Sequence, residues 1–196
     1  MSIDHRMIVP LLLLAGLLLA AVVTDIRSRR IPNRLVLGGL LAGLLLQATV
    51  TPGAGLYTSP FGALGLASGA GGFALGLALL LPMYMLGALG AGDVKLMGVV
   101  GAFLGPHAIF GAVLCTLLAG GILALSWSLA QGSLLHVLRN IKLLVVGSAL
   151  RMVGGGSARL DAPPTPTGKL PYAIAIACGT LGYVALSQTG TWEILS

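Results

Sequence analysis

The sequence predicts an all-α, polytopic membrane protein, and three observations support this. Hydrophobic residues make up 57% of the 196-residue chain, charged residues make up only 8%, and the mean hydropathy is +1.01. The charges cluster and leave long uncharged runs between them, as is typical of membrane-spanning helices. The net charge of +6 comes from basic residues in short connections between apolar runs, so we expect lipid contact and no nucleic-acid partner. We expect one membrane-embedded domain over residues 1–196.

Six uncharged runs are candidates for transmembrane helices. A helix rises ~1.5 Å per residue, and the hydrocarbon core is ~30 Å thick. Turn-forming residues near Pro52 and Pro60 divide one long run, and Gly105-Pro106 divides another. The predicted spans are 7–24, 35–50, 61–86, 93–104, 107–131 and 170–192. The 12-residue span 93–104 can cross only if its Asp93 end lies below the membrane surface or if the helix continues through Pro106.

Small residues recur at helical spacing in the third predicted span. They are Gly65, Gly69, Gly72 and Gly76. Such spacing lets a neighbouring helix approach closely, so we interpret these glycines as packing residues rather than ligand contacts.

A different pattern occupies residues 132–151. Its polar and small residues fall roughly on one helix face, while the remainder is Leu, Val and Ile. The face consists of His136, Arg139, Asn140, Gly147 and Arg151. This predicts an amphipathic helix in the cytoplasmic interface, either a plain connector, which we favour, or a surface that meets substrate or anionic lipid.

The basic residues predict the topology. Six spans place both termini on one side of the membrane, and ten of the eleven Lys and Arg residues then fall on the other side, with Arg6 as the exception. Because basic connections stay in the cytoplasm, we expect a multi-pass membrane protein with both termini outside.

Two of the five acidic residues lie at the inner ends of predicted spans, and these are Asp25 and Asp93. Two neighbouring carboxylates cannot both ionise cheaply, so one keeps a proton while the other activates water, which is the chemistry of aspartic proteases. Simpler roles remain open. Asp25 could pair with Arg27, Arg29 or Arg30, and Asp93 could pair with Lys95 or cap a helix.

Other catalytic groups are missing from the sequence. It contains no G-x-S-x-G, H-E-x-x-H or P-loop motif, and its two cysteines, Cys115 and Cys178, lie far apart. We therefore expect no metal and no cofactor.

Two motifs resemble those of the type IV prepilin peptidase family, membrane aspartic proteases of the G-x-G-D type. The first is Asp25-Ile-Arg-Ser-Arg-Arg-Ile-Pro-Asn and the second is Gly90-Ala-Gly-Asp93-Val-Lys95-Leu, and Lys169-Leu-Pro171-Tyr172 is similar to the start of the last helix in the family. The resemblance implies that Asp25 and Asp93 are the catalytic pair and that Gly90 and Gly92 shape the adjoining loop. Five further residues match motif positions without an assigned role, namely Arg27, Pro32, Asn33, Lys95 and Pro171.

The chain also departs from the larger family members. These carry a cytoplasmic insert with paired C-x-x-C motifs and methylate the new pilin N-terminus, whereas this chain has no such insert. It resembles the short branch that serves Flp or tight-adherence pili, which implies cleavage of the basic leader of a prepilin or pseudopilin at the cytoplasmic face, without N-methylation.

Two rival functions remain. The same aspartates could serve a proton- or cation-coupled transporter, although their position at span ends beside arginines disfavours this. The chain could also be a non-catalytic assembly factor, for which the glycine-rich third span would suffice.

Overall fold

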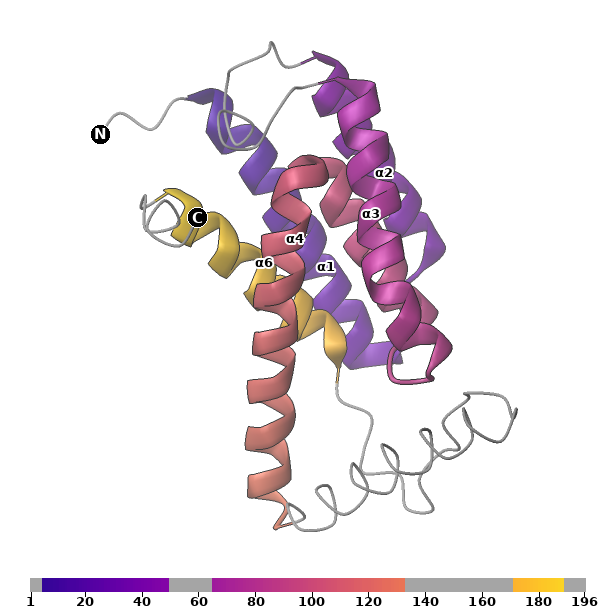
Figure 1. The fold of residues 1–196 in the computed structure, drawn as a ribbon, viewed down its shortest axis with the longest axis vertical. Coiled ribbons are helices and arrows are strands. Elements are labelled where there is room, and N and C mark those ends of the chain that lie inside the picture. Colours follow the sequence, from indigo (N-terminus) through magenta and orange to yellow (C-terminus); the bar gives the residue numbers. More distant parts are fainter. Residues whose placement is uncertain (1–4, 50–64, 133–170, 189–196) are drawn as a thin grey trace, which may run out of the picture.

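The computed structural model describes residues 5–49, 65–132 and 171–188, and these form an all-α bundle without strands (Figure 1). The helices of this part are α1 (His5–Ser28), α2 (Asn33–Thr49), α3 (Leu66–Met85), α4 (Ala91–Ala130) and α6 (Tyr172–Gln188). The all-α prediction is therefore confirmed for these residues. The amphipathic helix predicted over 132–151 lies outside them.

The described residues do not support six transmembrane helices. Three helices are long and apolar enough to cross a membrane, namely Val9–Ser28 of α1, α3 and α4. α2 and α6 are apolar but have only 17 residues each, or ~25 Å of helix, which is shorter than a typical hydrocarbon core. The predicted spans 93–104 and 107–131 both fall within α4, whose 40 residues include non-helical backbone at Gly105.

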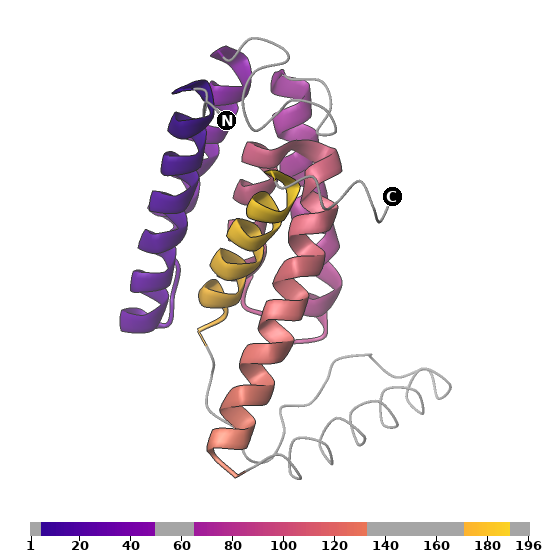
Figure 2. The same cartoon turned by 90° about the vertical axis from the view of Figure 1, so that its left-hand side faces the viewer.

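The helical backbone of α4 is interrupted at the predicted position, and the chain changes direction there. Gly105 has φ 81° and ψ 175°, a backbone conformation that glycine adopts readily, and Pro106 lacks the N–H that a helix needs. The chain reverses its direction here (Figures 1 and 2). α4 thus has a first arm (residues 91–104) and a second arm (residues 106–130). The second arm runs back along the bundle in the opposite direction.

A side chain from α2 compensates for this break. Because Pro106 has no N–H, the carbonyl of Ala102 loses its helical partner, and the turn at Gly105 also disturbs the bond to Phe103. The buried amide nitrogen of Gln47 donates to both carbonyl oxygens, at 3.3 Å for Ala102 and 3.4 Å for Phe103. Gln47 therefore satisfies backbone groups that water cannot reach.

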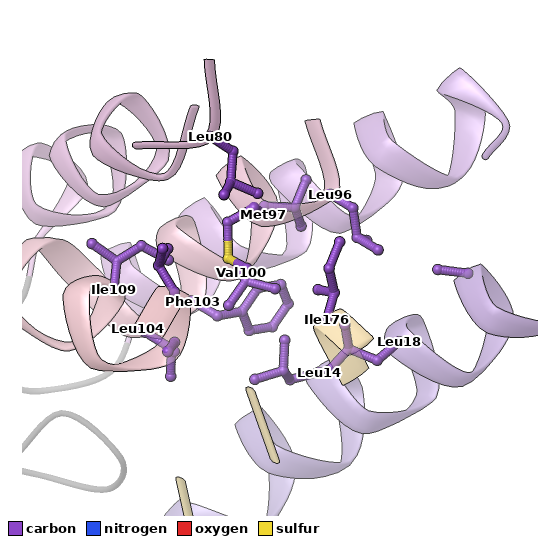
Figure 3. Packing of buried hydrophobic residues seen from close by; sticks show 14 of the residues in the cluster. Leu14, Leu18, Leu80, Leu96, Met97, Val100, Phe103, Leu104, Ile109 and Ile176 are labelled. Atoms are coloured by element: carbon purple, nitrogen blue, oxygen red, sulfur yellow. The ribbon is translucent and has the colours of Figure 1, made fainter. Parts of the chain in front are cut away.

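The first arm of α4 is the centre of the core. It is buried on all sides from Leu96 to Leu104, as expected of a helix whose entire circumference is apolar. Figure 3 shows Met97, Val100 and Phe103 of this arm surrounded by side chains from three other helices, which include Leu14, Leu18, Leu80 and Ile176. Many large apolar side chains, such as Leu12 and Ile122, also cover the outside, as expected where lipid replaces water.

Glycines let α3 and the first arm of α4 meet backbone to backbone. A Cβ atom on Gly72 would overlap the carbonyl oxygen of Gly101, and a Cβ atom on Gly101 would overlap the carbonyl oxygen of Gly72. Gly76 is similarly placed against Met97. The packing role predicted for the α3 glycines is thus confirmed, except for Gly65. A Cβ atom on Gly65 would meet nothing within 4 Å, and this residue precedes the helix with a φ of 144°.

A pair of neighbouring glycines tests this contact. Gly72→Ala should destabilise the protein by roughly 1–3 kcal/mol, because the added methyl group forces α3 and α4 apart. Gly71→Ala is the matched control, since a Cβ atom at Gly71 meets nothing and alanine favours helix. Thermal unfolding in detergent measures both, and equal melting temperatures for the two variants would contradict the close contact.

Replacing Gln47 tests the compensation of the α4 break. Gln47→Leu keeps the side-chain size but leaves two buried carbonyls without a donor, so we expect a loss of about 1–3 kcal/mol in the free energy of unfolding. Thr49→Ala removes a polar side chain that bonds only within α2 and should have little effect. An unchanged melting temperature for Gln47→Leu would show that the kink does not need this donor.

Candidate active site

Asp25 lies in the last turn of α1 and is almost fully buried, with 8% of its surface exposed. Its Oδ2 accepts a hydrogen bond of 3.3 Å from the backbone N–H of Ala173. Ala173 is in the first turn of α6, where N–H groups have no partner within their own helix. Asp25 is therefore held by the start of α6.

The simpler role considered for Asp25, an ion pair with a nearby arginine, is not seen in the described residues. Arg27, Arg29 and Arg30 are all exposed. Arg29 closes the end of α1 with a φ of 52°, and its N–H donates to the carbonyl of Asp25. The arginines thus belong to the surface beyond the helix end, while the Asp25 carboxylate points into the bundle.

Asp93 is in the first turn of α4 and is half-buried. Its Oδ2 accepts a hydrogen bond of 3.1 Å from the backbone N–H of Gly90, just before the helix. The simpler role of stabilising the helix start is therefore present in the structure. The alternative pairing with Lys95 is not, because Lys95 bonds to Asn33 instead.

The structure brings the two aspartates to one end of the bundle. α1 ends there, and the first arm of α4 and helix α6 both begin there (Figure 1). Asp25 accepts the N–H of Ala173 at the start of α6, and Ile31, six residues after Asp25, packs on Gly92 beside Asp93. Three helix ends that are far apart in the sequence therefore form one polar cluster.

Gly90 and Gly92 have no side chain, and the space beside them is occupied by the Asp93 carboxylate and by Ile31. A Cβ atom on Gly90 would lie 3.1 Å from Oδ2 of Asp93, in the path of the carboxylate that bonds to its N–H. A Cβ atom on Gly92 would lie 3.2 Å from the Cβ atom of Ile31, in the α1–α2 connection. Both glycines thus permit close contacts around Asp93.

The remaining motif residues have distinct positions. The carbonyl of Pro32 accepts the N–H groups of Leu35 and Val36 and so starts α2, and Pro171 does the same for α6 by accepting the N–H of Ile174. Asn33 bonds to Lys95 through its Oδ1, which lies 3.1 Å from Nζ. Arg27 is exposed and has no hydrogen bond or ion pair with another described residue.

A groove lies along a face of α4 that does not include Asp93. Its volume is about 710 Å³, and residues from α2, α3 and the start of α4 line it. Ala91, Val94 and Lys95 are on the same turns as Asp93, and Lys95 and Asn33 are its main polar residues. The other lining residues are Val36, Leu37, Leu40, Phe73, Leu77, Leu81 and Tyr84.

Sequence reasoning did not identify three of the groups at this site. They are the backbone N–H of Ala173, the side chain of Tyr172, and Ile31. A proline before an apolar run signals a helix start, and hence free N–H groups near Pro171, but no local signal shows that Asp25 accepts one of them.

In the described part of the chain, no three His, Cys, Asp or Glu residues are grouped as a metal would require.

A comparison with known proteins identifies the family of the chain. A model of the type IV leader peptidase family matches residues 12–125, which include Asp25, Asp93 and the glycines beside Asp93. No curated protein and no solved structure is similar enough to match the chain. Because the match spans more than half of the sequence, the chain belongs to the type IV leader peptidase family.

Proposed function

We propose that this protein is a membrane aspartic endopeptidase that removes the basic leader of a type IV prepilin or pseudopilin. The observation that carries the proposal is that the end of α1 with Asp25 and the start of α4 with Asp93 lie at the same end of the bundle (Figure 1). Membership of a leader peptidase family supports the reaction type. The transporter considered as a rival gains no support, because these aspartates lie at helix ends rather than midway along a helix.

The two carboxyl groups would share the work of hydrolysis. One is ionised and takes a proton from water, which attacks the carbonyl carbon of the scissile peptide bond. The other is protonated and gives its proton to the leaving nitrogen as the C–N bond breaks. Hydrogen bonds from Ala173 and Gly90 hold the carboxylates in place, so the geometry for attack is set before substrate binds.

The surroundings support a substrate that has an apolar segment. The groove between α2, α3 and α4 is lined mainly by apolar side chains and reaches the turn that carries Asp93.

The cysteines are free and isolated, Cys115 in α4 and Cys178 in α6, and the chain has no C-x-x-C motif. We therefore propose cleavage without N-methylation.

We further propose that the site faces the cytoplasm of a bacterial cell, with the protein in the inner membrane. The arginines that follow Asp25 support this orientation. Reporter fusions at Ser28 and Gly155 should then be cytoplasmic, and fusions at Ser59 and Gly190 should be periplasmic. Fusions near Asp25 and Asp93 that report opposite faces would rule out a shared site.

Substitution of the aspartates tests the proposed chemistry. Asp25→Asn and Asp93→Asn should each lower leader cleavage by roughly 10³-fold or more, and the double variant should be no worse, because both groups serve one step. Even Asp→Glu should reduce the rate, since one methylene displaces the carboxylate. The measurement is release of the leader from a prepilin by purified protein in detergent.

The control for this test is Asp161→Asn, which removes an acidic residue from outside the motifs and should cleave normally. A transporter would not cleave in detergent at all. A peptidase with other catalytic groups would keep its activity after replacement of Asp25 or Asp93, and either result would refute the assignment.

A further inference from the structure

The two aspartates lie on helices that scarcely contact each other. α1 packs mainly against α6 and α2, whereas the first arm of α4 packs against α3. Figure 2 shows α6 between α1 and the second arm of α4. α1 meets the first arm of α4 in the core through side chains such as Leu14 and Leu18 (Figure 3), which lie about two turns or more before Asp25. Closer to the aspartates, other segments connect the two helix ends.

One such connection is the segment between α1 and α2. It begins four residues after Asp25, and the connection and the first residue of α2 each contact the start of α4. Ile31 packs on Gly92, and Asn33 accepts a hydrogen bond from Lys95. The two contacts lie on either side of Asp93 in the sequence, so they hold the turn that carries its carboxylate.

The Asn33 side chain bonds to Lys95 and does not cap the start of its own helix. Asparagine at a helix start usually accepts N–H groups of the first turn. Here the carbonyl of Pro32 accepts those of Leu35 and Val36, and the Oδ1 of Asn33 instead meets Lys95, 62 residues away. Both side chains are exposed, so water screens the bond and it adds little to stability. Its effect is to fix where the first turn of α4 lies.

We propose that Asn33 and Lys95 are a positioning pair that sets the separation of Asp25 and Asp93. This inference rests on the proposed peptidase function. The pair joins the two motifs directly, and neither residue takes part in the proton transfers. Loss of the bond frees the first turn of α4 to shift relative to the α1–α2 connection, and shifts of about 1 Å in a catalytic geometry can lower a rate by ~10²-fold.

Steady-state kinetics of leader cleavage test the pair. Lys95→Met and Asn33→Leu should each lower kcat by roughly 10- to 100-fold with KM within about twofold of the wild-type value, because the dyad geometry is disturbed but the substrate is still bound. The double variant should be no slower than the slower single variant, since both remove the same bond. Asn33→Asp keeps an oxygen acceptor for Lys95 and should retain most of the wild-type kcat.

Arg34→Met is the matched control. It removes an exposed cation next to Asn33 that has no hydrogen bond or ion pair within the described residues, and it should leave kcat unchanged. Thermal unfolding of each variant in detergent shows that the protein is folded, and Asn33→Asp provides the test if Asn33→Leu does not fold.

The outcomes separate this inference from the proposed function. Full kcat in Lys95→Met, or a kcat in Asn33→Asp as low as in Asn33→Leu, would overturn the positioning role. A raised KM with unchanged kcat would also overturn it, by showing that the pair contacts substrate in the adjoining groove. Cleavage by Asp25→Asn or Asp93→Asn in the same series would instead refute the aspartic mechanism itself.

Discussion

The need to satisfy backbone hydrogen bonds in an apolar environment governs this fold. The break at Gly105 and Pro106 frees carbonyl groups in the middle of the bundle, where a buried polar group without a hydrogen bond is destabilising. Gln47 supplies the missing donor from α2. Because the break is tolerated, the second arm of α4 returns along the bundle, where Gly120 receives the ring of Tyr172 close to the end that carries Asp93.

The same requirement explains how a chain with so few charges holds two carboxylates. Each accepts a backbone N–H at a helix start, Asp25 from α6 and Asp93 from the residue before α4. The first N–H groups of a helix lack partners of their own and carry partial positive charge, so they stabilise an anion without a basic side chain. The basic residues Arg27, Arg29 and Arg30 can therefore remain on the surface.

Features that depend on local chemistry could be predicted from the sequence. The break at Gly105-Pro106 and the position of Asp25 and Asp93 near helix ends follow from proline chemistry and from charges between uncharged runs. The donor that the break needs, the side chain of Gln47, could not be predicted, because it depends on how α2 packs against α4. Nor could the partners of Asp25 and Lys95, which are 148 and 62 residues away, since helical periodicity carries no information at such separations.

The bond between Asp25 and α6 also has a consequence for the order of assembly during synthesis. α3 and the first arm of α4 are consecutive in the chain and joined by a short turn with Gly87 in a left-handed conformation, so they can pair as soon as both are inserted. α6 follows α4 by about 40 residues. A nascent chain therefore carries both aspartates before it has the Ala173 donor, and the cluster is completed only when α6 packs between α1 and α4.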